Sequence, residues 1–266
     1  MIKPSKRVAA REQFFSVLFA LFLREIKTRF GERRFGWLWV IGEPLLHLFV
    51  LLTVFVFLSN HMMPQVPFEL FLVTGLIPYF IFQRAVTGLM ASIDSNKALF
   101  AYRPVKPIDT YITRLILETL IYLCVFVVII FGFGFFMGLD ISIYHPLMTL
   151  GIFFVLLTMG FAFGVIASLI VDVFPTARII IKVLMMPLYF LSGIMYPLWI
   201  VPSQYLHYLQ YNPIVHLVEL LRESYFSHYP VVNGISLLYP LIVTVVALFI
   251  ALYFYRFRRF ALAAKP

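Results

Sequence analysis

Residues 146–171 read PLMTLGIFFVLLTMGFAFGVIASLIV, and none of these 26 residues carries a charge. A helix needs about 20 consecutive apolar residues to cross the hydrocarbon core of a bilayer. The stretch therefore predicts a transmembrane helix and places the chain among membrane proteins.

The composition and five further apolar stretches extend this prediction to the whole chain. Of the 266 residues, 62% are hydrophobic and only 12% are charged, whereas soluble domains carry roughly 25% charged residues. So little charge cannot cover a water-facing surface, and six spans use roughly half of the chain. We therefore predict an all-α membrane protein with six transmembrane helices, built as one domain over residues 1–266. The expected spans are residues 36–58, 70–93, 112–138, 146–171, 179–199 and 235–255.

The basic residues lie almost entirely in one set of loops. Nineteen of the 21 Lys and Arg residues fall in the N-terminal segment, in 94–114, in 172–182 and in the C-terminal tail. Of the other two, Arg84 lies within a predicted span and Arg222 lies in the opposite set of loops. Because cytoplasmic loops are enriched in Lys and Arg, both termini are expected in the cytoplasm. Membrane topology thus explains the net charge of +9, and no nucleic-acid partner is expected.

The first apolar segment is too short and too charged to span. Residues 12–30 are expected to form an amphipathic helix in the membrane surface, with Phe15 and Phe22 on its apolar face. Arg24 and Arg29 would then snorkel or face the lipid headgroups. The alternative is a cytoplasmic helix that packs on a partner.

Residues 196–235 are expected to form a re-entrant helical hairpin on the extracytoplasmic side. Pro202 begins one short helix, and Asn212 and Pro213 supply the N-cap and the first position of a second. Each helix is too short to cross the membrane, and such a hairpin is tolerated only where protein or a water-filled cavity satisfies its backbone. The second helix is predicted to have an apolar face of Ile214, Leu217, Leu220 and Leu221, and a polar face of Glu219, Arg222 and Glu223.

Three ionisable residues lie within or near the predicted spans. Glu43, Arg84 and Glu118 would be costly in lipid, so they are expected to face the bundle interior or a water path. Glu43 and His47 are four residues apart and share a helix face. One interpretation makes Glu43, His47, Tyr79 and Arg84 part of a substrate channel, with Arg84 facing an anionic substrate. The other is a structural ion pair of Arg84 with Glu43 or Glu118.

Aromatic side chains are concentrated in the predicted hairpin. Tyr196, Trp199, Tyr205 and Tyr208 are candidates for lining the channel, because aromatic rings suit the apolar faces of sugar rings. The alternative is an aromatic belt at the membrane–water interface.

Other motifs mainly limit the function. Gly160 and Gly164 form a GxxxG pattern, which we expect to serve helix packing within the subunit rather than a dimer contact. The single cysteine, Cys124, excludes an intrachain disulfide and a cysteine metal cluster. The chain has no GxxxxGK[ST] phosphate loop and no clustered catalytic residues, so we expect neither its own ATPase activity nor a bound cofactor or metal.

Three stretches resemble the permease subunits of ABC exporters for bacterial polysaccharides. They are Arg33 to Leu45 (RRFGWLWVIGEPL), Asn96 to Pro107 (NKALFAYRPVKP), and the series Ser192 to Tyr196 (SGIMY), Pro202, Asn212-Pro213 and Glu219-xx-Arg222. The order of these motifs covers most of the chain. The Glu43-Pro44 pair most resembles the capsular polysaccharide branch, whereas Asn212-Pro213 looks more like the O-antigen and teichoic acid branches.

The resemblance implies a larger assembly in the bacterial inner membrane. Two copies of this chain would pair with two ATPase subunits, which would bind ATP and Mg²⁺. Lipid-linked capsular polysaccharide would cross between the two copies, and periplasmic and outer-membrane export proteins would receive it. Loop 94–107 would hold the coupling helix that docks on the ATPase, with candidate contacts Asp94, Asn96, Lys97, Leu99, Phe100 and Arg103.

Other functions remain open at this point. The same family includes export permeases for O-antigen and teichoic acid. An ion-coupled secondary transporter would use the ionisable residues of the spans as ion or proton sites, but spans 1–3 and 4–6 show no repeat. A membrane enzyme acting on lipid-linked sugar would need catalytic residues that the sequence does not cluster.

Overall fold

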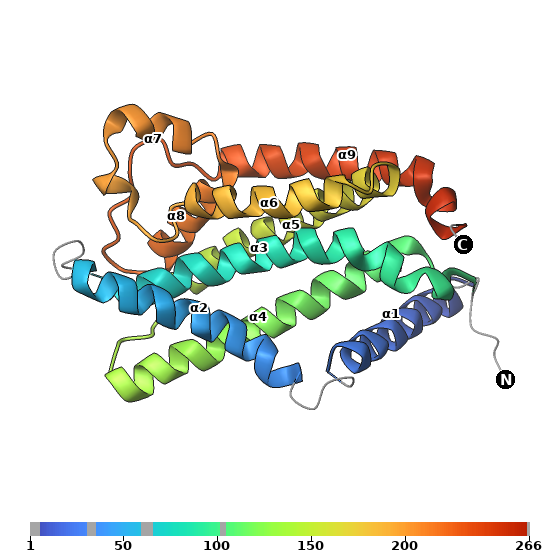
Figure 1. The fold of residues 1–266 in the computed structure, drawn as a ribbon, viewed down its shortest axis with the longest axis horizontal. Helices are drawn as coiled ribbons and strands as arrows, with labels where there is room; N and C mark the ends of the chain where they lie inside the picture. The colour runs from blue at the N-terminus through green and yellow to red at the C-terminus, as the bar shows by residue number, and fades with distance from the viewer. Residues whose placement is uncertain (1–5, 31–35, 60–65, 102–104, 265–266) are drawn as a thin grey trace.

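The computed structural model describes residues 6–30, 36–59, 66–101 and 105–264, and over these ranges the secondary structure is entirely helical. Figure 1 shows long helices that run side by side along one axis, with the short helices α7 and α8 at one end. The described elements are α1 (Lys6–Phe30), α2 (Gly36–Ser59), α3 (Phe68–Asn96), η1 (Lys97–Ala101), α4 (Pro107–Met137), α5 (Pro146–Val173), α6 (Ala177–Phe190), η2 (Leu198–Ile200), α7 (Ser203–Leu209), α8 (Pro213–Tyr225) and α9 (Leu238–Ala263).

Four of the described helices are long and apolar enough to cross a membrane. These stretches are Phe68–Phe100, Pro107–Met137, Pro146–Val173 and Leu238–Leu262. They match the predicted spans over 70–93, 112–138, 146–171 and 235–255. α2 adds a shorter apolar stretch, Gly42–Val54, among the residues whose side chains are described.

The central helix of the bundle is α3, which packs most extensively on α5. A Cβ atom added at Gly160 would lie 3.0 Å from Ala85 Cβ, and one at Gly164 would lie 3.0 Å from the Ala85 carbonyl and from Leu89. These glycines therefore let the two backbones approach closely. The prediction that the GxxxG pattern packs within the subunit is confirmed.

The predicted fifth span, over 179–199, is an uninterrupted helix only as far as Phe190. α6 ends at Phe190 and has 14 residues, so it is about 21 Å long and shorter than the roughly 30 Å hydrocarbon core. Pro187 lies in its last turn, and Gly193 adopts a positive φ of 65° just beyond it. A left-handed residue cannot continue a right-handed helix, so the chain turns at this point.

The predicted polar face of the second hairpin helix is also wrong. The hairpin does contain two short helices, α7 and α8, and Asn212 caps α8 by accepting a hydrogen bond of 3.0 Å from the Ile214 amide. Glu219 and Arg222, however, point into the protein and are 1% and 0% exposed. Both faces of α8 are covered, because the helix packs against α3, α5 and α9.

Arg222 binds backbone carbonyls at the point where the chain leaves α6. Its guanidinium donates to the carbonyls of Gly193 at 2.8 Å and Ile194 at 2.9 Å, and to Glu219 at 3.1 Å. It also lies 3.5 Å from the centroid of the Phe71 ring on α3. Backbone that leaves a helix inside an apolar environment needs such partners.

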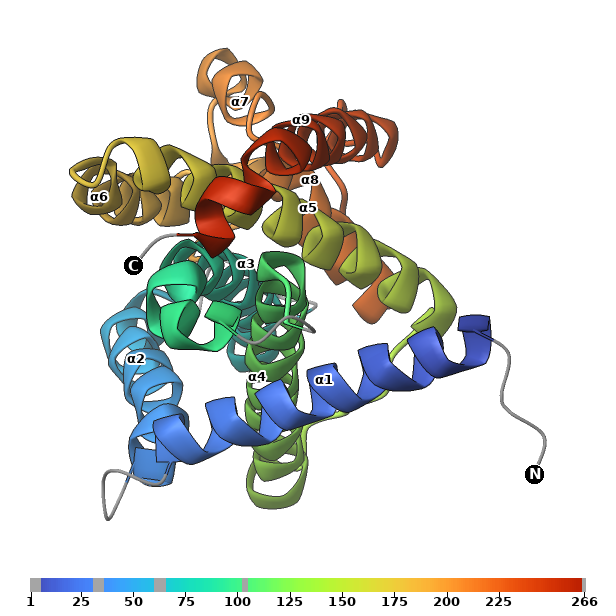
Figure 2. The ribbon, with the colours of Figure 1, turned by 90° about the vertical axis from the view of Figure 1, so that its right-hand side faces the viewer.

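Helix α1 crosses one end of the bundle (Figure 2). It confirms the helix predicted over 12–30, but the prediction for its arginines is wrong. Arg24 donates to Asn96, and Arg29 donates to Glu118 at 2.7 Å, so both bind protein groups. Their partners lie on α3 and α4, and α1 is therefore docked on the bundle by its polar residues. Phe15 is 56% exposed.

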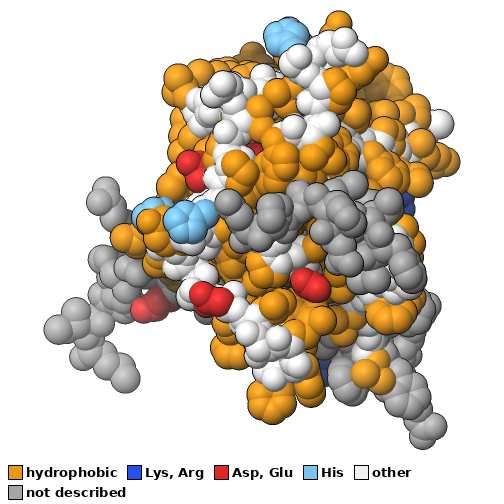
Figure 3. All heavy atoms as spheres, turned by 90° about the vertical axis from the view of Figure 1, so that its left-hand side faces the viewer, with side chains coloured by type: hydrophobic (Ala, Val, Ile, Leu, Met, Phe, Trp, Pro, Cys, Tyr) orange, Lys and Arg blue, Asp and Glu red, His pale blue; other side chains and the backbone are white. Residues whose placement is uncertain are grey.

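The two ends of the bundle differ in charge. The start of α1, the end of α9, η1 and the start of α6 lie at the right-hand end of Figure 1. Figure 3 looks at the opposite end, where acidic side chains and histidines are visible among the coloured residues, and Lys and Arg show only as small patches. The fold thus gathers the basic segments of the sequence at one end.

Candidate functional site

A polar cavity of about 630 Å³ opens between five helices near the basic end of the bundle. α3 supplies most of its wall, and α1, α2, α4 and α6 each add charged groups. The cavity is lined by Thr28, Arg29, Glu43, Gln83, Arg84, Thr87, Gly88, Met90, Ala91, Arg114, Glu118, Arg178 and Lys182.

Arg84 and Glu43, two residues singled out from the sequence, meet at this cavity. They form an ion pair in which the Arg84 side chain is 31% exposed and the Glu43 side chain is 51% exposed. The Arg84 Nε also donates to the Tyr122 hydroxyl at 3.0 Å, which orients the guanidinium. Arg84 therefore forms the ion pair with Glu43 that one interpretation predicted, and its side chain also lines the cavity.

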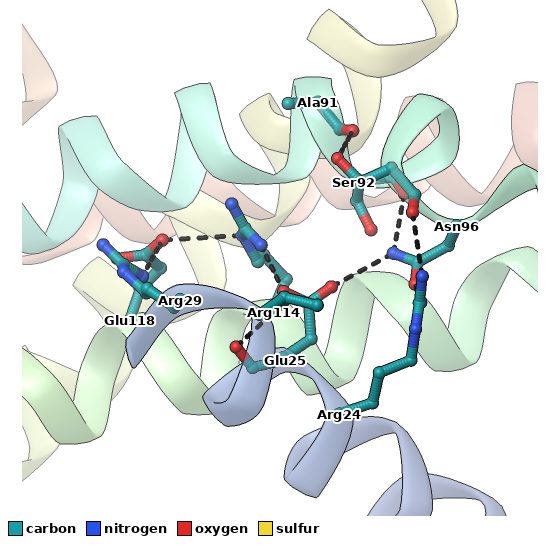
Figure 4. A network of polar contacts seen from close by, with 10 residues as sticks. Arg24, Glu25, Arg29, Ala91, Ser92, Asn96, Arg114 and Glu118 are labelled. Atoms are coloured by element: carbon teal, nitrogen blue, oxygen red, sulfur yellow. Dashed lines mark hydrogen bonds and ion pairs between the residues drawn. The ribbon is translucent and has the colours of Figure 1, made fainter. Parts of the chain in front are cut away.

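A second ionic network forms the wall on the α1 side (Figure 4). Glu118 on α4 accepts from Arg29 at 2.7 Å and lies 3.5 Å from the Arg114 Nε. Arg114 also pairs with Glu25 on α1, and Glu25 in turn accepts from the Asn96 side chain at 3.1 Å. The network joins three helices and ends one residue before η1.

Comparison with known families identifies the fold that carries this cavity. The profile of the ABC-2 type transporter family matches residues 16–226. The chain belongs to the ABC-2 type transporter family. The match includes α1 from residue 16 onward, the cavity, the interruption after α6 and the Glu219–Arg222 pair. The chain is thus the membrane component of a transporter.

Individual members of the ABC-2 type transporter family resemble this chain over most of its length. The polysialic acid transport protein KpsM of Escherichia coli is 43% identical over 243 residues, which are 91% of this chain and 93% of that protein. The capsule polysaccharide export inner-membrane protein CtrC of Neisseria meningitidis serogroup A is 31% identical over 79% of each chain. The O-antigen export system permease protein RfbA of Klebsiella pneumoniae is 27% identical over 88% of this chain and 90% of its own.

Two other predicted channel residues, His47 and Tyr79, lie in an aromatic cluster around Tyr189 and are not part of the cavity lining. His47 and Tyr189 share a hydrogen bond of 3.0 Å. Tyr79 is buried, and its hydroxyl donates to the Met185 carbonyl of α6. Tyr79 therefore ties α3 to α6 and has no open side toward a channel.

The four aromatic candidates of the hairpin do not form one surface. Trp199 is half-buried and packs on Tyr229, with ring centroids 5.3 Å apart. The Tyr196 hydroxyl donates to the Phe190 carbonyl at 3.0 Å. Tyr205 is exposed on α7, as is Tyr208, which also borders an apolar groove of about 660 Å³ between α3, α5 and α6.

The predicted coupling residues divide into exposed and buried groups. Asp94 is exposed and pairs with Arg178 on α6, and it lies 3.8 Å from Lys97. Asn96 is 1% exposed and Phe100 is 9% exposed, with Phe100 packed in a core that includes Ile93. Leu99 is half-buried on η1, whereas Arg103 lies outside the described residues.

Sequence reasoning missed several residues that line the cavity. The sequence pattern places all of them in loops or at the membrane surface, because each lies near the end of an apolar stretch. They are Arg29, Arg114, Arg178 and Lys182. Arg178 and Lys182 are four residues apart, so their spacing could have placed them on one face of α6. For Arg29 and Arg114, only the docking of α1 on α4 reveals the role.

Proposed function

We propose that this chain is the permease subunit of an ATP-driven exporter for lipid-linked capsular polysaccharide. The observation that carries this proposal is the 43% identity with the polysialic acid transport protein over 91% of the chain. The capsule export protein CtrC is 31% identical and the capsule export protein BexB 26–28% identical, against 27% for the O-antigen permease. O-antigen export is therefore the second candidate.

Complementation tests the substrate branch directly. The gene is expressed in two bacterial strains, one without its capsule permease and one without its O-antigen permease, each keeping its own ATPase. We expect surface polysaccharide to return in the capsule strain only, as measured with a polysaccharide-specific antibody. Restoration in the O-antigen strain alone would move the chain to the other branch.

We also propose the six-span topology with both termini in the cytoplasm. α2 and the segment formed by α6 with residues 191–199 would add two crossings to the four long helices, and α7 and α8 would form a re-entrant hairpin. Support comes from the gathering of basic segments at one end of the bundle and from the carbonyls that Arg222 satisfies.

Single cysteines test this topology in a Cys124→Ser background. A cysteine at Ser203 is expected to react with a membrane-impermeant maleimide added to spheroplasts, whereas one at Lys106 reacts only after lysis. The reverse pattern would invert the chain in the membrane.

The docking of two ATPase subunits on two copies of this chain is part of the same proposal. η1 lies at the basic end, and Leu99 and Lys97 on it are partly exposed, so they are the better candidates for direct contact. Phe100 is buried and would instead hold η1 on the bundle. We expect Leu99→Asp to reduce co-purification of the ATPase at unchanged permease level, whereas Phe100→Asp reduces the permease level itself. Full ATPase association in Leu99→Asp would exclude this contact.

A further inference from the structure

The polar cavity has a charge composition that its own ion pairs do not balance. Five cationic side chains line it, but only two carboxylates do, Glu43 and Glu118. Two more carboxylates reach the lining from outside, because Glu25 pairs with Arg114 and Asp94 pairs with Arg178. Lys182, four residues after Arg178 on α6, has no carboxylate partner among the described residues.

Arg84 also has binding capacity to spare. A guanidinium carries five N–H donors, and the recorded bonds use Nε for Tyr122 and Nη2 for Glu43. Roughly three donors therefore remain. The pair with Glu43 is partly exposed, and such pairs are weak enough to be exchanged for another anion.

Glu118, in contrast, is already committed. It is 3% exposed, and it contacts Arg29 and Arg114 together. A buried carboxylate held by two guanidinium groups is not available to bind a cation. The accessible part of the cavity therefore presents Arg84, Lys182 and an exchangeable Glu43.

We propose that this cavity is an anion-binding site in which Arg84 and Lys182 hold a phosphate or carboxylate group of the exported molecule. This inference rests on the proposed export function for the identity of the ligand, but the binding itself does not depend on it. Arg84 forms a planar, bidentate contact that matches both groups. Lys182 adds a flexible point charge from α6, so ligand binding connects α6 to α3 across the cavity.

The two chemical sources can be separated with water-soluble probes. Purified full-length permease in nanodiscs of neutral lipid is titrated with glycerol 3-phosphate, with a sialic acid tetramer and with neutral maltotetraose. Dissociation constants are measured by ligand-observed NMR. Binding of glycerol 3-phosphate alone would assign the site to the lipid-anchor phosphate, and binding of the sialic acid tetramer alone would assign it to the sugar carboxylates.

Three variants test the residues. Lys182→Gln removes a charge that pairs with no carboxylate in the described ranges, so folding is expected to be unchanged. We expect it, and Arg84→Gln, to weaken binding of the anionic probe about tenfold, as removal of a charge-assisted contact does. Arg256→Gln removes an exposed charge outside the cavity and should leave binding within twofold.

Equal binding of the anionic and neutral probes, or unchanged binding in both Lys182→Gln and Arg84→Gln, would overturn the proposal. Surface polysaccharide is scored separately in cells. A protein that binds the anion but restores no capsule would contradict the export function and leave the site intact.

Discussion

Replacing Gly75 with alanine should disturb Arg222, the most buried ionic group among the described residues. Gly75 lies on α3, opposite the interruption that follows α6. A Cβ atom added there would lie 2.4 Å from Arg222 Nη2, and 3.3 Å from both Arg222 Cζ and the Ile194 Cα. Arg222 cannot move away freely, because it is 0% exposed, stacks on Phe71 and donates to the Gly193, Ile194 and Phe71 carbonyls.

The size of the effect follows from these contacts. Carbon atoms pack at about 3.5–4.0 Å, so the Arg222 guanidinium must shift by roughly 1 Å. That shift breaks the bonds of Nη2 to Ile194, at 2.9 Å, and Phe71, at 3.3 Å, while Nη1 keeps its own. Breaking a buried pair completely costs about 3–5 kcal/mol, so we take about 3 kcal/mol for this partial loss. Alanine is more favourable than glycine in a helix by up to about 1 kcal/mol. The free energy of unfolding should therefore fall by about 2 kcal/mol in total.

The assay is thermal unfolding of the purified permease in detergent, followed by tryptophan fluorescence. For a chain of this size, 1 kcal/mol changes Tm by about 2–4 °C. Gly75→Ala should therefore lower Tm by about 4–8 °C. Gly88→Ala is the matched control on the same helix, because its Cβ would come no closer than 3.3 Å to the side chains of Glu118 and Arg114, which border a cavity. It should leave Tm unchanged or slightly raised.

Two results would refute the reasoning. One is a Tm for Gly75→Ala within about 2 °C of that for Gly88→Ala. The other comes from a double-mutant cycle: Gly75→Ala should destabilise an Arg222→Met protein by at least about 1 kcal/mol less than it destabilises the parent. Equal effects in both backgrounds would show that the added methyl acts on something other than Arg222.

Three further predictions concern other helix contacts. Gly164→Ala places a Cβ 3.0 Å from α3 and should lower the free energy of unfolding by about 1–2 kcal/mol. The control Gly151→Ala, whose Cβ would have nothing within 4 Å, should leave this free energy unchanged. Equal Tm values for the two variants would contradict the close packing. Asn212→Ala removes the N-cap of α8 and should cost about 1 kcal/mol, and an unchanged Tm would show that the cap is dispensable. Glu25→Gln weakens the docking of α1, so trypsin should cleave at Lys27 several times faster than in the parent; a control Glu12→Gln, at an exposed site, should not change that rate.

Much of the fold could be predicted from the sequence, because long uncharged stretches in a membrane have few structural options. The helices α3, α4, α5 and α9 follow from apolar length alone. The hairpin helices were found from Asn212 and Pro213, since capping is a local preference that needs no knowledge of distant residues. The Arg84–Glu43 pair was foreseen as one alternative, because a charge in a span needs a partner.

The errors came from residues whose partners are far away in the chain. Arg24 and Arg29 carry the signature of a membrane-surface helix, but their acceptors lie 72 and 89 residues further on. Glu219 and Arg222 look like the polar face of a surface helix, yet the break after α6 offers carbonyls that draw Arg222 inward.

The sequence by itself determined that the protein spans a membrane, where most of its helices lie and which segments carry its basic residues. These properties depend on apolar length, on local capping and on charge asymmetry, all of which act within a few turns of helix. Only the tertiary structure decided which ionic groups face each other. An ion pair forms only where its two members lie close together in space. The cavity around Arg84 and the Arg222–Glu219 pair therefore depend on how the helices pack together.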